Sequence, residues 1–360
     1  MFEVSRDQAL AWRLRRHRLV ERAAPSELVD VVGRIGGLHA QLMSSAQLSL
    51  WARVEGLEPD ALANALWEKR TLVKLWAMRG TLHVLPAAEL GLWLAGLGTF
   101  THYGNSWPET DELAAAVEVA LDSKPLTREE LASRVEQLTG SQSFGEHLRE
   151  SWGSYLKALT FRGLVCFAPS EGGRVRFTRP AHWVRGGLGR LDPEDALREI
   201  GRRYLGAYGP TGVAELARWW GGGRSRGARM LESLADEAVE VDVEGERAWM
   251  LEAHLADLAR AEAPNVARLL PAFDPWIASV RNGLVEPEHA PRVYRPQGWM
   301  SPVLLVKSRV AGVWRHALKG RRLAVEIEPF GRLPRWAGGE IEAEAKRLAE
   351  FLGGELELRR

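Results

Sequence analysis

The sequence predicts an α+β fold in which groups of helices are each followed by a pair of short strands. Three features carry this prediction: helical stretches with apolar residues at three- and four-residue intervals, short β-rich runs joined by glycine-containing turns, and the repetition of this order. The 360 residues are 46% hydrophobic and 26% charged, which is ordinary globular composition, and the length suits two to four compact units. We therefore expect an array of units rather than one core.

The first group covers residues 1–106. Its expected helices are residues 6–19, 26–35 and 57–69, and Gly36-Gly37 breaks the second of them. Two expected strands, residues 72–78 and 81–85, then flank Arg79-Gly80. Helices followed by a hairpin are the outline of a winged helix.

The same order occurs twice more, in residues 107–187 and 188–262. In the second group Thr127 and Glu130 predict a capping box at the start of a helix, and Glu171-Gly172-Gly173 predicts the turn of a hairpin. In the third group Ser225 is the expected cap of the last helix. The expected third-group elements are helices 195–208, 213–220 and 227–235, and strands 239–243 and 248–251. We thus predict three tandem winged-helix units, with linkers near residues 107–108, 186–187 and 261–264.

The pattern of the sequence changes in residues 263–360. Three short β-rich runs with polar turns predict a small C-terminal β-barrel, and a helix and an edge strand follow them. The expected strands are residues 303–307, 310–316, 323–327 and 355–358, and the expected helix is residues 341–352.

Several classes of function are disfavoured by composition. Cys166 is the single cysteine, and the nine histidines show no His-Glu-x-x-His spacing, so we expect no disulfide, no metal site and no other cofactor. The most apolar stretch, residues 75–100, is interrupted by Arg79, Pro86 and Glu89, so no membrane span is expected. The N-terminus lacks the pattern of a secretory signal, which predicts a cytoplasmic protein.

Arginine dominates the positive charge. The formal net charge is only +1, but 41 of the 48 basic residues are arginine, the side chain best suited to phosphate contacts. Genome base composition explains this bias equally well. The run Arg13, Arg15, Arg16 and Arg18 covers more than one helix face and is interpreted as a solvated surface.

One short segment carries candidate chemistry. His39 and Gln41 lie two residues apart in an apolar context, directly after Gly36-Gly37. In a regular helix such positions do not share a face, but at a helix start or kink they can converge. Spacing alone favours the structural interpretation, in which they cap or satisfy buried backbone groups.

Two other segments are candidates for phosphate contacts. Arg79, Thr81 and His83 lie on the first hairpin, where a purely structural role is as plausible. The glycine-rich run at residues 219–227 carries Arg224 and Arg226 at a helix start but lacks the Gly-Lys-Ser/Thr of a nucleotide-binding loop.

Asp274, before a proline, is interpreted as an Asx-turn residue rather than a catalytic acid. The run Gly223-Arg224-Ser225-Arg226-Gly227 has Gly-x-Ser-x-Gly spacing, but it joins two expected helices instead of following a strand, so it is not interpreted as a nucleophile elbow. No Gly-x-Gly-x-x-Gly follows an expected strand.

Five runs, in order along the chain, together resemble the AlkZ family of bacterial DNA glycosylases, which includes the YcaQ-like enzymes. They are Leu38-His39-Ala40-Gln41, Met78-Arg79-Gly80-Thr81-Leu82-His83, Arg203-Tyr204-Leu205-Gly206-Ala207-Tyr208-Gly209-Pro210, residues 269–275 and Ala311-Gly312-Val313-Trp314-Arg315. The resemblance implies tandem winged helices, a C-terminal β-barrel and a concave DNA-binding face. It also implies excision of alkylated purines and, for some members, unhooking of interstrand crosslinks. The first glutamine of the family's Gln-x-Gln catalytic segment is His39 here, and only Gln41 is kept.

The leading hypothesis is a monomeric, monofunctional DNA glycosylase associated with the nucleoid and acting on double-stranded DNA with alkylated bases. His39 and Gln41 would position the attacking water, and Arg79, Thr81, His83, Arg224 and Arg226 would bind DNA. A non-catalytic winged-helix regulator is the alternative, because His39 replaces a glutamine within the family's catalytic segment. A protein-interaction scaffold is the third hypothesis.

Overall fold

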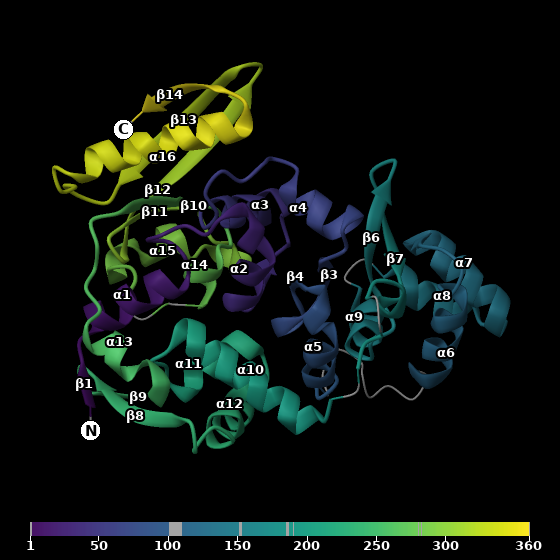
Figure 1. Cartoon of the computed structure of the whole chain (residues 1–360). Coiled ribbons are helices and arrows are strands. Elements are labelled where there is room, and N and C mark those ends of the chain that lie inside the picture. Colours follow the sequence, from purple (N-terminus) through teal and green to yellow (C-terminus); the bar gives the residue numbers. More distant parts are fainter. Residues whose placement is uncertain are drawn as a thin grey trace. The chain divides into compact units, whose positions relative to one another are not determined.

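A computed structural model describes residues 2–100, 110–150, 153–184, 187–189, 191–279, 281 and 283–359 (Figure 1). The chain divides into two units, each assembled from separate stretches of sequence. Unit 1 comprises Met1–Leu62, Gly201–Trp219 and Gly223–Arg360, and unit 2 comprises Ala63–Ile200 and Trp220–Gly222. The expected linkers at residues 107–108 and at residue 186 lie outside the described residues.

Unit 1 contains the N-terminal helices, most of the third helix–hairpin group and the C-terminal region. Its helices are α1 (Arg6–Arg16), α2 (Leu28–Arg34), α3 (Met43–Trp51), α12 (Gly223–Glu232), α13 (Leu255–Ala259), α14 (Pro275–Ser279), α15 (Ala290–Val293) and α16 (Ala337–Leu352). Its strands are β1 (Phe2–Val4), β2 (Leu38–His39), β8 (Ala238–Val243), β9 (Glu246–Leu251), β10 (Ala267–Leu270), β11 (Val303–Val306), β12 (Arg309–Lys319), β13 (Arg322–Pro329) and β14 (Glu355–Arg359).

Unit 2 contains the first hairpin and the second helix–hairpin group. Its helices are α5 (Leu90–Leu97), α6 (Thr110–Ala120), α7 (Arg128–Thr139), α8 (Gln142–Arg149) and α9 (Ser154–Phe161). Its strands are β3 (Leu72–Trp76), β4 (Leu82–Pro86), β5 (Leu126–Thr127), β6 (Cys166–Glu171) and β7 (Arg174–Thr178). Three helices run across the division between the units: α4 (Ala61–Ala63), α10 (Pro193–Tyr208) and α11 (Val213–Trp220).

Local signals explain several of these elements. The side chain of Thr127 accepts the N–H of Glu130, and the Glu130 side chain reaches back, so the expected capping box of α7 is confirmed. The β6–β7 hairpin turns at Gly172 and Gly173, whose φ angles of 56° and 77° are readily adopted by glycine. Helix α12 begins at Gly223, so the expected cap at Ser225 is wrong, and that serine lies inside the helix.

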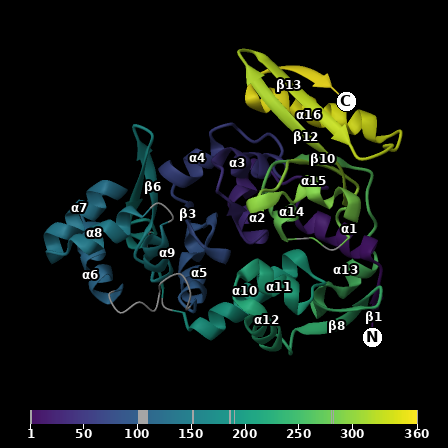
Figure 2. The same cartoon turned by 180° about the vertical axis from the view of Figure 1, so that it is seen from behind.

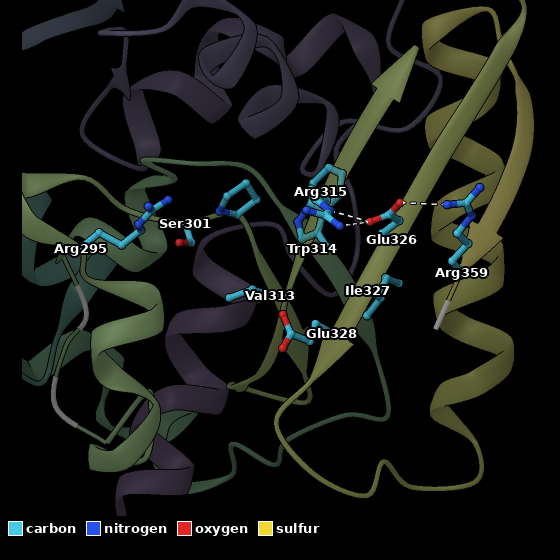
Figure 3. Close-up of a pocket in the computed structure, with 10 residues that line it drawn as sticks. Arg295, Ser301, Val313, Trp314, Arg315, Glu326, Ile327, Glu328 and Arg359 are labelled. Carbon is cyan, nitrogen blue, oxygen red and sulfur yellow. Dashed lines mark hydrogen bonds and ion pairs between the residues drawn. The ribbon is translucent and has the colours of Figure 1, made fainter. Parts of the chain in front are cut away.

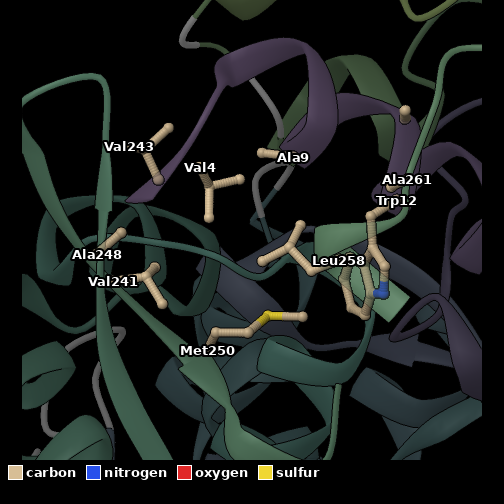
Figure 4. Packing of buried hydrophobic residues seen from close by; sticks show 10 residues of the cluster. Val4, Ala9, Trp12, Val241, Val243, Ala248, Met250, Leu258 and Ala261 are labelled. Atoms are coloured by element: carbon tan, nitrogen blue, oxygen red, sulfur yellow. The ribbon is translucent and has the colours of Figure 1, made fainter. Parts of the chain in front are cut away.

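The third helix–hairpin group is completed by the chain's N-terminal strand. Strand β1 pairs parallel with β8, and Val4 lies opposite Val243. Val4 then packs with Trp12, Met250 and other side chains of α1, β8, β9 and α13 in one buried cluster (Figure 4). This pairing was not expected, because three residues carry too little periodicity to predict a strand.

The C-terminal strands form one open sheet in the order β10-β11-β12-β13-β14. The pairs are antiparallel except for β13 with β14, which is parallel. Within the described part of the chain no pairing joins β14 to β10, so the expected closed barrel is wrong. Helix α16 contacts both of these edge strands, and Figures 1 and 2 show it lying against the sheet. The apolar side of the sheet is therefore covered by a helix rather than by closure.

Among the described residues, the hairpins β3–β4, β6–β7 and β8–β9 each follow helices, and the fold is α+β. Helices α3, α5, α6 and α8 were not expected from the sequence.

Candidate active site

The segment that carries His39 and Gln41 leaves helix α2 through two glycines. Gly36 and Gly37 have φ angles of 71° and 98°, and their N–H groups donate to the carbonyl oxygens of Gly33 and Val32. This left-handed exit ends the helix and turns the chain into extended backbone. His39 therefore lies on a short strand, and Gln41 lies in a bend directly before α3, whose N-cap is Leu42.

The two candidate side chains are each more exposed than the residue that precedes them on this segment. Leu38 and Ala40 are buried, whereas His39 is half-buried and Gln41 is exposed. Burial thus alternates along residues 38–41, which is consistent with His39 and Gln41 facing the same, more exposed side.

Side chains from a distant part of unit 1 hold the glycine turn in place. The Tyr208 hydroxyl donates to the carbonyl oxygen of Ile35 at 2.8 Å. A Cβ atom at Gly36 would lie 2.9 Å from Cζ2 of Trp219, so this position has no room for a side chain. The turn that delivers His39 thus depends on packing from α10 and α11.

An aromatic contact orients the His39 ring. The rings of His39 and Phe273 are stacked, with centroids 5.1 Å apart and planes 16° apart. Phe273 in turn contacts Trp299, with centroids 5.2 Å apart. The Trp299 side chain is 48% exposed, which is unusual for so large an apolar group. Neither Phe273 nor Trp299 was expected at this site, although Phe273 lies in the run of residues 269–275 that contributes to the family resemblance.

A buried ion pair fixes the loop that carries Phe273. Two Arg53 nitrogens donate to the two carboxylate oxygens of Asp274, each at 2.7 Å, and both side chains are 0% exposed. Asp274 Oδ1 also accepts the N–H of Trp276, so the expected Asx-turn is confirmed. Phe273 itself has a φ of 58°, a conformation that costs free energy for a residue other than glycine. The ion pair therefore helps to hold a strained residue against His39.

The predicted contacts on the first hairpin lie in unit 2. Arg79 and Thr81 are partly exposed, and Arg79 adopts a φ of 59° in the hairpin turn. His83 is 3% exposed, and its Nδ1 lies 3.0 Å from the carbonyl oxygen of Thr81. His83 therefore has a structural place in the hairpin, and its burial does not favour contact with phosphate.

The glycine-rich run also reaches this hairpin. A Cβ atom at Gly221 would lie 2.8 Å from Cα of Arg79, so glycine is required where the two segments meet. Arg224 and Arg226 lie in the first turn of α12, in unit 1, with Arg224 exposed. Exposed N–H groups at a helix start favour anions, which is consistent with the expected phosphate contacts.

A cavity of about 700 Å³ lies on the C-terminal sheet and holds none of these predicted residues. Its lining includes Arg315, Arg359 and Glu326, and Figure 3 shows both guanidinium groups paired with that carboxylate. The pairing cancels much of the charge. We therefore do not assign the candidate chemistry to this cavity.

The described part of the chain has neither a cluster of metal-binding side chains nor a helix that could span a membrane. No group of three or more histidine, cysteine, aspartate or glutamate side chains there could hold a metal ion. No described helix combines the length and apolar character needed to cross a membrane.

Comparison with known proteins places this arrangement in a family. Residues 32–351 match the model of a family described as DNA glycosylase AlkZ-like. The chain is 34% identical over 362 aligned residues to an interstrand DNA cross-link repair glycosylase of Streptomyces sahachiroi, with 96% of each chain covered. It also superimposes on the solved structure of Streptomyces sahachiroi DNA glycosylase AlkZ, with a TM-score of 0.88, 33% identity, and 99% and 100% of the two chains covered. The chain therefore belongs to the AlkZ-like family of DNA glycosylases.

Proposed function

We propose that this enzyme hydrolyses the N-glycosidic bond of purines alkylated at N7 or N3 in double-stranded DNA, with His39 and Gln41 positioning the attacking water. The observation that carries the proposal is the alternating burial along residues 38–41, which leaves His39 and Gln41 accessible, with the His39 ring stacked on Phe273. The family membership supports the reaction class. The substrate is the one that the resemblance to the AlkZ family implies, and the chemistry of these side chains is consistent with it.

Such a substrate needs little acid catalysis. An N7- or N3-alkylated purine carries positive charge, so its C1′–N9 bond breaks with the electron pair passing to the base, which leaves as a neutral molecule. The water oxygen then bonds to C1′, and its proton passes to a base or to solvent. The side chains have two tasks, which are to orient the water and to stabilise the positive sugar.

Histidine and glutamine suit these tasks in different ways. The Gln41 amide oxygen can accept a hydrogen bond from the water but cannot take its proton. A neutral imidazole at His39 can do both. The replacement of the family's first glutamine by His39 therefore adds a proton acceptor to the site.

We also propose that the three helix–hairpin groups are winged-helix units that present this site to DNA, in the division 1–106, 107–187, 188–262 and 263–360. The β6–β7 and β8–β9 hairpins, each following helices, support this division. Arg79, Thr81, Arg224 and Arg226 are proposed as DNA contacts. His83 was expected among the DNA contacts, but we assign it a structural role beside Thr81 instead.

The test is release of free base from duplexes that carry 7-methylguanine or 3-methyladenine, followed by mass spectrometry of the base and alkaline cleavage of the DNA. We expect release by the native protein and its loss in the His39→Ala/Gln41→Ala double variant. A His182→Ala/Gln137→Ala double variant is the matched control, because both side chains are exposed and lie in unit 2. Full activity of the His39/Gln41 variant would overturn the site assignment.

A His39→Gln variant tests the role of the imidazole. We expect it to retain base release, because an amide can still hold the water. Its rate should lose the fall at acid pH that protonation of the imidazole causes in the native enzyme. Identical pH profiles would show that His39 is not the proton acceptor. Binding to one operator sequence without release of any base would instead favour a regulator.

A bulky adduct and an interstrand crosslink belong in the same substrate panel. The Streptomyces sahachiroi relative is named for crosslink repair. Release from these duplexes by the native protein would extend the proposal to them.

A further inference from the structure

A second pocket in unit 1 is lined by five arginines among eight residues. It has a volume of about 390 Å³ and lies between the end of α1, the end of α2 and α13. Five guanidinium groups face one carboxylate there, and the lining residues are Trp12, Arg15, Arg16, Arg18, Arg34, Asp257, Arg260 and Ala261. The basic run near the N-terminus is therefore not simply a solvated surface: Arg13 is buried, and its three arginine neighbours line this pocket.

Hydrogen bonds to backbone orient two of these arginines without neutralising them. Arg16 Nε donates to the carbonyl oxygen of Gly206 at 2.7 Å, and the guanidinium lies 5.5 Å from the centre of the Trp12 ring. Arg15 Nη1 donates to the carbonyl oxygen of Glu262 at 3.1 Å. A carbonyl oxygen carries no net charge, so both arginines keep theirs while their geometry is fixed.

Carboxylates neutralise only part of the positive charge in the pocket. Arg18 pairs with Glu27 at 3.0 Å, and Arg260 lies 3.6 Å from Asp257. Arg34 is exposed and has no carboxylate partner among the residues that the structure describes. The pocket therefore keeps an excess of positive charge at Arg15, Arg16 and Arg34.

The charges in the pocket affect one another. Burial lowers the pKa of Arg16, and the neighbouring positive charge of Arg34 lowers that pKa further. Like charges held in one pocket repel, and a bound anion would relieve that repulsion. Several guanidinium forks around a small space also match the oxygens of a phosphate group.

We propose that this arginine pocket binds a phosphodiester of the DNA backbone and so anchors the strand beside the catalytic segment. This inference rests on the proposed function for its choice of DNA as the source of the phosphate. Arg34 ends α2, and His39 follows five residues later. Five residues span at most about 18 Å, which is less than one turn of a duplex at about 34 Å. The anchored phosphate and the reacting nucleotide therefore lie within one turn of each other.

The test is the salt dependence of binding to a short unmodified duplex, measured by fluorescence anisotropy. Each phosphate contact contributes about −0.9 to the slope of log K against log salt concentration. We expect the Arg15→Ala/Arg34→Ala double variant to bind more weakly and to have a slope smaller in magnitude by about 0.9. Both side chains are exposed, so their removal should leave folding intact.

Arg332→Ala/Arg335→Ala is the matched control, because it removes the same charge from exposed positions outside the pocket. A slope and affinity of the pocket variant equal to those of this control would overturn the proposal. A free phosphate is the other source of the same chemistry. Calorimetric binding of inorganic phosphate that is lost in the pocket variant, with an unchanged DNA slope, would overturn the assignment to DNA.

The binding assay uses unmodified DNA and needs no base release. A change of slope in the pocket variant would therefore stand even if no alkylated base were released. Conversely, base release with an unaltered slope would leave the glycosylase proposal standing and refute the pocket alone.

Discussion

The buried ion pair between Arg53 and Asp274 leads to a sharp prediction about stability. Both side chains are 0% exposed and are joined by two hydrogen bonds of 2.7 Å. Asp274→Asn keeps the size and the acceptor for the Trp276 N–H but leaves the guanidinium without a buried counter-charge. Removing one partner of such a pair costs about 3–5 kcal/mol.

That cost translates into a large thermal shift. A unit of about 150–250 residues loses about 2–4 °C of Tm per kcal/mol, so Asp274→Asn should lower the Tm of unit 1 by roughly 6–20 °C in scanning calorimetry. Glu328→Gln is the control, because it makes the same chemical change in an exposed pair with Arg292. Exposed pairs contribute about 1 kcal/mol or less.

The pair should also show its coupling in a double-mutant cycle. Arg53→Met in the Asp274→Asn background removes the unpaired charge. It should therefore lower the free energy of unfolding by less than Arg53→Met does in the native protein. Phe273 precedes Asp274 and stacks on His39, so base release should fall at a temperature where the variant is still folded. A Tm for Asp274→Asn no lower than that of the Glu328→Gln control would refute the reasoning.

Three further predictions concern the turn, the thiol and one buried imidazole. Gly36→Ala should destabilise the protein by about 1–3 kcal/mol more than Gly56→Ala in urea unfolding, because both positions have positive φ but only Gly36 packs on Trp219. Cys166 is buried, and burial raises the pKa of its thiol, so a disulfide reagent should label it only after denaturation. Burial lowers the pKa of His17 well below its usual value, so the unfolded chain binds this proton at a higher pH than the folded chain. His17 should therefore reduce stability below about pH 6.5 by up to ~1.4 kcal/mol per pH unit, and His17→Phe should flatten that dependence.

Each of these three predictions has an outcome that would contradict it. Equal losses for the two glycine variants would show that the contact at Gly36 is not limiting. Rapid labelling of the native protein would show that the thiol is accessible. A stability profile for His17→Phe that falls in parallel with that of the native protein would assign the acid sensitivity to other groups.

The sequence by itself determined the features whose causes lie within a few residues of chain. The capping box of Thr127 and Glu130, the turn at Gly172-Gly173 and the Asx-turn of Asp274 were all expected and are all present. Each depends on hydrogen bonds or φ angles that neighbouring residues set among themselves. The AlkZ-like resemblance could also be recognised from the sequence, because its short runs occur in a fixed order.

The tertiary structure decided what depends on partners far away in the chain. His39 lies on a short strand that leads into α3, and the contact that orients its ring comes from Phe273. Arg53 finds its counter-charge 221 residues away. The C-terminal strands form an open sheet because α16 covers it.

The basic run Arg13, Arg15, Arg16 and Arg18 shows what the sequence determines and what the tertiary structure decides. Spacing alone suggested a solvated face, yet the fold buries Arg13 and gathers Arg15, Arg16 and Arg18 around a pocket with arginines from α2 and α13. A sequence states which charges a chain carries, but burial and counter-charges are set by elements that meet only on folding. Whether an arginine is solvated, structural or a ligand for phosphate is for that reason decided by the tertiary structure.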